Sequence, residues 1–390
     1  MAEHRQAAWG RIDELADQLW ELAVRIHSYP ELGFEERKAS GWLVQILREA
    51  GFEVEIPYGG LETAFRAEHP AGRAGPTVAV LAEYDALPGL GHACGHNLIA
   101  TIAVGAALGL APLKAQLPGR LVVLGTPAEE GGGGKVRLIE AGAFRDIDVA
   151  LMVHPASRTL VERGSLAITE VEIEFTGKAA HASSEPEKGV NALDAAIQTF
   201  NALNALRQHI ADGARIHGII TDGGAKPNIV PEHAACRFYV RAADNTYRDE
   251  LVERLHNCAR GAAVATGAEL AFRKVGHEYK AMRPNHFLAQ AFRRHLEDLG
   301  YPPEQAAGGM GSTDMGDVSW EVPAIHPYIR ITEAEVPGHS REFAQAAKGD
   351  AARAGMLAAA KAVAGTCLDL WTQPELYRRV REEFAGGTGS

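Results

Sequence analysis

The spacing of apolar residues in the first part of the chain switches between helix-like and strand-like periods. Apolar positions recur at helical spacing over residues 11–28, and again through Leu43 and Leu47 up to Gly51. Strands are then predicted at 78–81, 121–124 and 149–153, and helices at 98–110 and 135–141. These strands are apolar throughout rather than alternating, so we predict an α/β fold with a mostly parallel sheet flanked by helices.

The pattern changes after Gly164. Residues 168–175 alternate between apolar and polar, which predicts a half-exposed strand. The next elements are predicted as a helix at 191–210, strands at 216–221 and 235–241, a helix at 247–265 and a strand at 269–274. Strand-helix-strand-strand-helix-strand is the ferredoxin-like order. We therefore predict that residues 165–276 form a smaller α+β domain, inserted into a larger domain of residues 1–164 and 277–390.

The α/β pattern returns at Pro284. The predicted elements are a helix up to residue 299, a Gly-rich loop at 308–316, an apolar strand around 325–331 and a last helix at 349–364. We expect them to complete the larger domain.

Charge and composition exclude several functional classes. The net charge of -11 argues against nucleic acid and anionic membranes as partners, because both bind clustered Lys and Arg. We expect no apolar run long enough to cross a bilayer, and the first residues predict a charged amphipathic helix instead of a signal peptide. The four cysteines show no Cys-x-x-Cys spacing, which is typical of reduced thiols. We expect a soluble cytoplasmic protein.

One short segment, Gly91-His-Ala-Cys-Gly-His-Asn97, concentrates metal-binding side chains between a predicted strand and a predicted helix. Asn97 is a plausible N-cap of that helix. A thiolate together with imidazoles suits a borderline-soft divalent metal such as zinc. The alternative is a buried cysteine beside two structural histidines.

Three successive strands of the larger domain end in residues that bind metals or carry protons. In open α/β sheets such strand ends meet at one crevice, where ligands bind. The residues are Asp85, Cys94 and His96 after the first strand, Glu129 and Glu130 after the second, and His154 after the third. Their combination predicts a metal site.

Two adjacent carboxylates in one loop cannot both point the same way. One of them can bind metal while the other stays free: Glu130 would be the ligand, and Glu129 could take a proton from a metal-bound water. A bridging Cys94 thiolate would hold two divalent ions close together, typically about 3.5–4 Å apart.

These residues resemble the motifs of the aminoacylase, carboxypeptidase G and hippurate hydrolase family of dinuclear metallopeptidases. The resemblance covers essentially the whole chain and points to the branch with a bridging cysteine. Gly-His-Ala-Cys-Gly-His-Asn is similar to the segment of aminobenzoyl-glutamate hydrolase subunits and β-alanyl-lysine-type dipeptidases. The His-x-Asp motif of distant branches reads Glu83-Tyr84-Asp85 here, so their ligand histidine is absent.

The resemblance implies a zinc-peptidase-like domain that holds two divalent metal ions, Zn²⁺ with Mn²⁺ or Co²⁺ as alternatives. Cys94 would bridge them, and His96 and His154 would complete one position. Glu130 and a late histidine would complete the other, with His339 as the candidate and His326 as its rival. Glu129 would act as general base. Asp85 would orient a ligand, and His92 has no assigned role.

The resemblance also assigns roles in the inserted domain, which would form a homodimer. His181, in Gly177-Lys-Ala-Ala-His-Ala-Ser, would reach the partner's active site and stabilise the oxyanion. Asn228 and Arg241 would bind the substrate carboxylate, because a guanidinium pairs bidentately with a carboxylate. Ser312, Thr313 and Asp314 of the Gly-rich loop would line the substrate site.

Other motifs give no competing function. Gly131–Gly134 followed by Lys135 lacks the spacing of a phosphate-binding loop, and we interpret it as a flexible turn. No Gly-x-Ser-x-Gly nucleophile elbow occurs. The sequence predicts a metal-dependent amidohydrolase or dipeptidase that acts on a small dipeptide or N-acyl amino acid. Alternatives are an aminobenzoyl-glutamate, hippurate or auxin-conjugate hydrolase, and a non-catalytic binding protein with the same fold.

Overall fold

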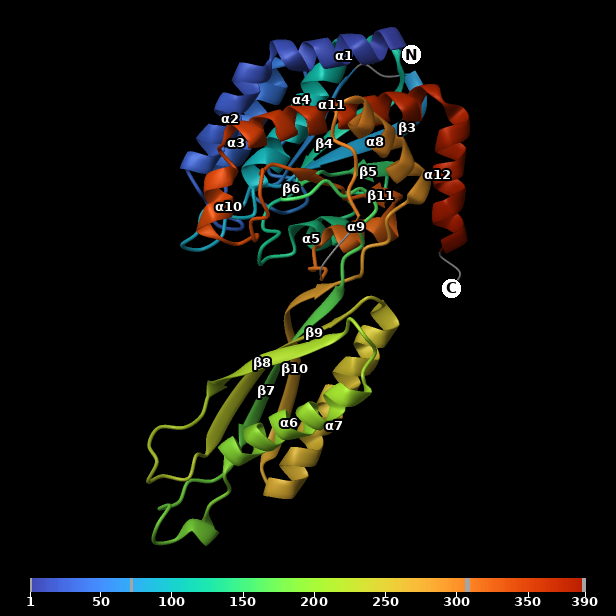
Figure 1. The fold of residues 1–390 in the computed structure, drawn as a ribbon. Helices are drawn as coiled ribbons and strands as arrows, with labels where there is room; N and C mark the ends of the chain where they lie inside the picture. The colour runs from blue at the N-terminus through green and yellow to red at the C-terminus, as the bar shows by residue number, and fades with distance from the viewer. Residues whose placement is uncertain (1, 71–72, 306–308, 388–390) are drawn as a thin grey trace. The chain divides into compact units, whose positions relative to one another are not determined.

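The computed structural model describes residues 2–70, 73–305 and 309–387, so Gly308 of the predicted Gly-rich loop lies outside the described residues. The described chain divides into two compact units. The smaller unit consists of Ser165–Met282 together with Gly309–Gly316, and the larger unit comprises the rest. The loop Gly309–Gly316 therefore groups with the inserted unit, although helices of the larger unit come before and after it in the sequence (Figure 1).

A mixed sheet forms the centre of the larger unit. Its strand order is β1-β2-β4-β3-β5-β11. The bounds are β1 Glu53–Glu55, β2 Phe65–Glu68, β3 Arg73–Ala82, β4 Pro118–Gly125, β5 Val149–Leu151 and β11 Ala324–Ile325. β4, β3, β5 and β11 pair in parallel, which confirms the predicted mostly parallel sheet. β1 and β2, which the sequence pattern did not reveal, add an antiparallel edge.

Helices cover both sides of this sheet. Their bounds are α1 Ala2–Glu14, α2 Ala16–Ser28, α3 Arg37–Glu49, α4 His96–Leu110, α5 Gly134–Glu140, α8 His286–Asp298, α9 Met315–Glu321, α10 Arg341–Ala346, α11 Asp350–Thr372 and α12 Pro374–Gly386. Figure 1 shows α1, α2, α4 and α11 above the strands and α5 and α9 below them. A separate parallel pair, β6 His154–Ala156 and β12 Tyr328–Arg330, lies close to α4 and α11.

Helix α4 corrects two expectations. Together with the following 3₁₀ turn, residues 96–116 are long and apolar enough to span a membrane by length and composition, contrary to the sequence analysis. Every residue of α4 is buried in the protein core, and this accounts for its apolar composition. Asn97 lies inside the helix and does not cap it, because the N-cap is Gly95 with a φ of 81°. The Asn97 side-chain amide instead donates to the carbonyls of Ala23 and Ala347.

Other boundaries also differ from the predictions. The predicted helix at 11–28 is two helices that meet at Leu15. The predicted strand around 325–331 is divided between β11 and β12, which belong to different sheets. The helix predicted as the last one, at 349–364, extends to Thr372 and is followed by α12.

The smaller unit has the predicted order of strands and helices. Its elements are β7 Ala167–Thr176, α6 Ala192–Leu206, β8 Arg215–Asp222, β9 His233–Ala242, α7 Asn245–Thr266 and β10 Glu269–Tyr279. The sheet is antiparallel in the order β10-β7-β9-β8, with β8 and β10 at its edges. Helices α6 and α7 contact each other and the sheet, and Phe175, Cys236 and Leu251 lie in the common core.

Candidate functional site

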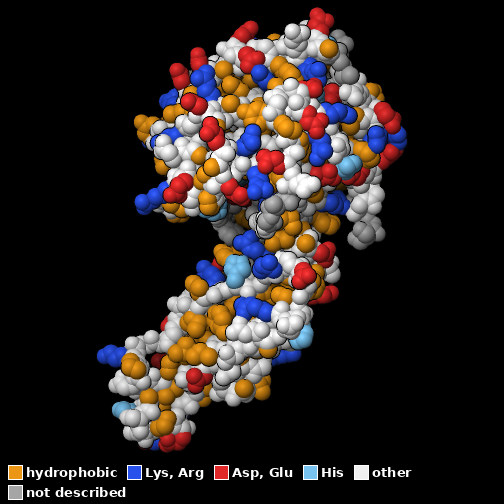
Figure 2. Space-filling model, viewed as in Figure 1, with side chains coloured by type: hydrophobic (Ala, Val, Ile, Leu, Met, Phe, Trp, Pro, Cys, Tyr) orange, Lys and Arg blue, Asp and Glu red, His pale blue; other side chains and the backbone are white. Residues whose placement is uncertain are grey.

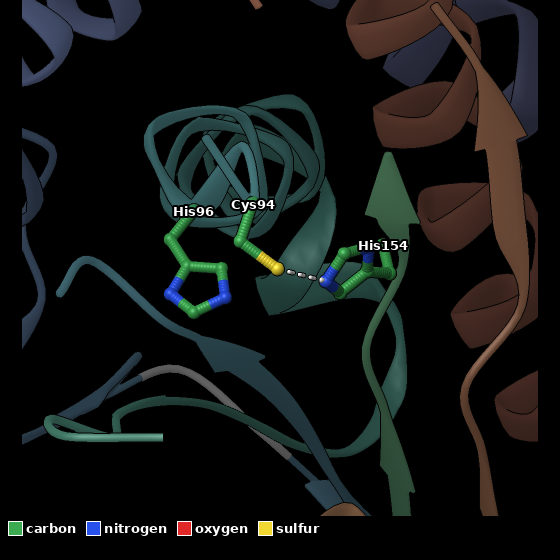
Figure 3. Close-up of side chains that lie close together, drawn as sticks. All are labelled: Cys94, His96 and His154. Carbon is green, nitrogen blue, oxygen red and sulfur yellow. Dashed lines mark hydrogen bonds between the residues drawn. The ribbon is translucent and has the colours of Figure 1, made fainter. Parts of the chain in front are cut away.

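Neighbouring strands bring the candidate ligands to one edge of the larger unit's sheet. β3 lies between β4 and β5, with Val80 opposite Val123 on one side and Leu151 on the other. The chain segments that leave these strands therefore start close together. Cys94 comes from the turn before α4, His96 is the first residue of α4, and His154 is the first residue of β6. Figure 3 shows the Cys94 sulfur lying between the two histidines.

Hydrogen bonds fix which nitrogen of each histidine is left for a metal ion. His96 Nδ1 lies 2.9 Å from the Oδ1 atom of Asp85, and His154 Nδ1 lies 2.7 Å from the carbonyl oxygen of Pro155. These oxygens accept, so both Nδ1 atoms donate, and each Nε2 is the nitrogen that can bind a metal ion. The Cys94 Sγ atom is 3.4 Å from His154 Nε2 (Figure 3). In the metal-free protein the thiol therefore donates to this nitrogen.

Two groups of candidate ligands share Cys94. Within each group, one ligand atom per residue lies within 4.8 Å of the others: Cys94, His96 and His154 form the first group, and Cys94, Glu130 and His339 form the second. A further group with the same spacing joins His96, Glu129 and Glu130. The structure thus brings together the five residues that the resemblance named as ligands.

His339 is the late histidine that reaches this cluster. Its Nε2 atom is 3.5 Å from Glu130 Oε1, and its backbone N–H donates to the Ala93 carbonyl at 2.9 Å. His339 has a φ of 58°, unusual for a residue with a side chain, and this hydrogen bond holds it beside the Cys94 turn. The rival His326 belongs to none of these groups. It is buried with its ring 5.5 Å from that of His154.

The electrostatics of the cluster suit cations. Three buried atoms that face it have no hydrogen-bond partner in the described structure: Glu83 Oε2, His96 Nε2 and Glu130 Oε1. Burial by itself would lower the pKa of His96, but Asp85, Cys94 and Glu83 raise it well above its ordinary value. Burial raises the pKa of the Cys94 thiol. Without metal the site retains protons, and divalent ions on these N, O and S atoms would replace them, so the residues fit a dinuclear centre.

Asp85 connects both groups of ligands. It is buried, and its second oxygen accepts from the Glu130 backbone N–H at 2.9 Å. The same carboxylate thus orients His96 and the loop that carries Glu129 and Glu130. Burial opposes ionisation of Asp85, yet its contacts with His96 and the Glu130 N–H hold its pKa below the ordinary value.

Sequence reasoning missed two buried residues here. Lys135 donates to Glu83, and both side chains are fully buried. Part of the Gly-rich stretch before Lys135 is closely packed: a Cβ at Gly134, the first residue of α5, would lie 1.8 Å from the Pro127 carbonyl oxygen, whereas a Cβ at Gly131 would have no neighbour within 4 Å. A long polar side chain directly after a glycine run was the only available signal.

A second buried glutamate contacts the loop that carries Glu129 and Glu130. Glu36 Oε1 accepts from the Ala128 N–H at 2.9 Å, and its Oε2 accepts from the Thr63 hydroxyl at 2.8 Å. Ala128 has a φ of 59°, so this contact holds a strained residue next to Glu129. His92 is also buried, but both ring nitrogens lack a hydrogen-bond partner among the described residues, and it stays unassigned.

The remaining predicted site residues lie in the smaller unit. His181 is exposed, and its Nδ1 lies 3.3 Å from the backbone N–H groups of Ser183 and Ser184. The Asn228 carbonyl accepts from Ala182, so the two loops adjoin. The other three residues lie on β9 and in the loop Gly309–Gly316. Arg241 donates to the Ser312 hydroxyl at 2.9 Å, and Thr313 is buried, with its hydroxyl accepting from the Met315 N–H.

Residues 79–362 match the model of peptidase family M20/M25/M40. The chain belongs to this family. It is 43% identical to the Xaa-Arg dipeptidase of Mus musculus, covering 97% of this chain and 92% of that protein. It is 40% identical to the human Xaa-Arg dipeptidase, with 96% and 90% covered. Identity to one of the p-aminobenzoyl-glutamate hydrolase subunits of Escherichia coli is 30%, with 96% and 92% covered.

Solved structures agree on the fold. The crystal structure of a Bacillus subtilis protein, described as a dinuclear metal-binding peptidase of the M20 family, covers 92% of this chain and 99% of its own at a TM-score of 0.71 and 22% identity. An aminobenzoyl-glutamate utilization protein from Klebsiella pneumoniae gives a TM-score of 0.72 at 21% identity, with 93% and 98% covered. The predicted fold and the predicted class of metal-dependent peptidase and amidohydrolase are confirmed.

Proposed function

We propose that this M20 enzyme is a dipeptidase that hydrolyses the amide bond of a dipeptide with a basic C-terminal residue. One observation carries the choice of substrate. Two mammalian proteins named Xaa-Arg dipeptidase match at 43% and 40% identity over nearly the full length of both partners. The cluster around Cys94 supports the hydrolytic chemistry.

The residues would divide between two ion positions that share Cys94. His96 and His154 would hold one ion, and Glu130 and His339 the other. Bound divalent ions, with Zn²⁺ as the first expectation and Mn²⁺ or Co²⁺ as alternatives, would supply activation of water and polarisation of the scissile carbonyl. Asp85 keeps the His96 ring in the tautomer that leaves Nε2 available.

Glu129 would handle the protons. Asp85 accepts a hydrogen bond from the backbone N–H of the neighbouring Glu130 and so orients this loop. One carboxylate oxygen of Glu129 lies within 4.8 Å of ligand atoms of His96 and Glu130. Glu129 would take a proton from the attacking water and return it to the leaving amine. General acid–base catalysis of this kind typically contributes about 10²–10⁴-fold in rate.

The smaller unit would recognise the substrate and supply a donor to the partner molecule of a dimer. Since His181 Nδ1 accepts from backbone N–H groups, its Nε2 carries the hydrogen and can donate to an oxyanion. Arg241, Ser312, Thr313 and Asn228 would bind the substrate's terminal carboxylate, with the guanidinium providing the charge.

A homodimer would place the partner's His181 at the active site. The edge strand β8 supports such a pairing: Ile219 is 64% and Ile220 is 41% exposed on it. Figure 2 shows hydrophobic side chains gathered on the side of the smaller unit where β8 and α6 lie. An apolar edge strand of this kind invites pairing with a second copy.

We also propose a cytoplasmic location, which the four free thiols support.

The test is hydrolysis by purified protein reconstituted with Zn²⁺, Mn²⁺ or Co²⁺. The panel contains dipeptides with C-terminal Arg, Lys, Leu and Glu, and p-aminobenzoyl-glutamate and hippurate as N-acyl amino acids. We expect the highest kcat/KM for C-terminal Arg or Lys, and loss of turnover in Glu129→Gln with metal content retained. Highest kcat/KM for an apolar or acidic C-terminal residue would refute the proposed substrate.

An N-acyl amino acid hydrolase is the second candidate. The 30% identity to the Escherichia coli p-aminobenzoyl-glutamate hydrolase chain, over nearly the whole length of both proteins, favours it. Preferred cleavage of p-aminobenzoyl-glutamate in the same panel would select this function. Binding of substrates without any turnover would indicate a non-catalytic protein.

A further inference from the structure

A buried ion pair borders the proposed metal centre. Glu83 follows the end of β3, and Lys135 is the second residue of α5. Lys135 donates to the Oε1 atom of Glu83, and both side chains have no exposed surface. Because the pair is buried, Lys135 offsets the charge of this carboxylate and fixes the direction of its second oxygen.

That second oxygen faces the cluster without a donor. Glu83 Oε2 has no hydrogen-bond partner in the described structure and lies 3.4 Å from His96 Nε2, which has none either. His96 Nδ1 donates to Asp85, so in the metal-free protein a proton on Nε2 faces the Glu83 oxygen, and a bound divalent ion would take the place of this proton.

Glu36 offers a comparison within the same unit. It is equally buried, and each of its oxygens accepts a hydrogen bond, from Ala128 and from Thr63. Glu83 instead engages one oxygen and directs the other toward a histidine nitrogen. The spacing is also informative: two ligands of one tetrahedral zinc ion, each about 2.0–2.2 Å from it, lie about 3.4 Å apart.

We propose that Glu83 is an additional ligand, through Oε2, of the divalent ion held by His96, and that Lys135 is a positioning residue that directs this oxygen. The inference rests on the proposed dinuclear site and adds a residue to it.

The test measures metal binding directly. Metal-free full-length protein is titrated with Zn²⁺ against a chromophoric chelator and with Co²⁺ by visible absorption. Glu83→Asp keeps the charge but shortens the side chain, and Glu83→Gln/Lys135→Gln removes both charges at similar volume. We expect each to weaken one of the two ions by at least about tenfold and to change the Co²⁺ bands. Asp148→Asn, at a carboxylate that belongs to none of the ligand groups, is the control and should bind both ions like the parent.

Parent-like affinities and Co²⁺ spectra in both Glu83 variants would overturn the inference, even if their melting temperatures fall, because the pair would then be only structural. Failure of the proposed function looks different: the parent itself would bind no divalent ions or would hydrolyse none of the amides. Should the double variant fail to fold, Glu83→Asp alone decides the question.

Discussion

Replacing Asp85 by Asn should weaken metal binding through a change in hydrogen bonding. The Asp85 carboxylate accepts from His96 Nδ1 and from the Glu130 N–H, both at 2.9 Å. An Asn side chain has one oxygen and one NH₂ group, so it can accept only one of these hydrogen bonds. If the oxygen faces Glu130, the His96 ring must adopt the other tautomer, and its Nε2 then carries a hydrogen in place of the lone pair.

The expected magnitude follows from the bond that is lost. A hydrogen bond to a charged group contributes about 1.5–3 kcal/mol. Each 1.4 kcal/mol corresponds to a factor of about ten in affinity, so Asp85→Asn should weaken Zn²⁺ binding by about 10- to 100-fold. The assay is competition with a chromophoric chelator, combined with the melting temperature of the metal-free protein.

Asp148→Asn is the matched control. Asp148 also accepts one backbone N–H, from Thr77 at 2.8 Å, and one side-chain donor, the Tyr377 hydroxyl at 2.9 Å. It belongs to none of the ligand groups. We expect this variant to lose stability without losing metal affinity. Asp85→Asn protein that binds both ions as tightly as the parent would refute the orienting role of Asp85.

Three other predictions concern catalysis, assembly and pH. His181→Ala and Glu129→Gln proteins should each lose about 10²-fold or more in kcat, and mixing them should restore partial activity; no recovery in confirmed heterodimers would exclude a contribution of His181 to the partner's site. Ile219→Glu should yield monomers by light scattering, whereas Val264→Glu, at a site 81% exposed on α7, should not; an unchanged dimer in Ile219→Glu would locate the interface elsewhere. Burial raises the pKa of Glu36 from 4.5 to about 7, so the folded state keeps this proton longer than the unfolded state and stability should fall by up to about 3 kcal/mol as the pH rises through that interval. Glu36→Gln should abolish this dependence of stability on pH, measured by urea unfolding of the metal-free protein. Tryptophan fluorescence reports on the larger unit, because all five tryptophans belong to it. An unchanged pH dependence in the variant would contradict the buried, protonated state of Glu36.

The sequence was most informative where the pattern of apolar residues was compatible with only one kind of secondary structure. Solidly apolar segments at 78–81 and 121–124 predicted parallel strands, and the candidate metal ligands that follow them do converge. Asn97 shows where local reasoning failed. An Asn before a helix usually caps it, but here acceptors from Ala23 and Ala347 engage the side chain, and Gly95 takes the capping position.

Glu83 and Lys135 could not be paired from the sequence for a similar reason. They are 52 residues apart, and a charged residue next to a strand or a glycine run is usually solvated. Only the fold, which buries both side chains at the same sheet edge, makes their contact visible. The short strands β1, β2 and β6 escaped prediction because three or four residues carry too little periodicity.

The membership of Gly309–Gly316 in the smaller unit limits how this protein can be dissected or recombined. A chimera that exchanges only Ser165–Met282 would separate Arg241 from its hydrogen-bond partner Ser312, which would come from the other parent. Substrate preference transplanted between relatives should therefore require both stretches together. Over evolution, this arrangement ties changes in the inserted unit to changes in a loop that lies far along the chain.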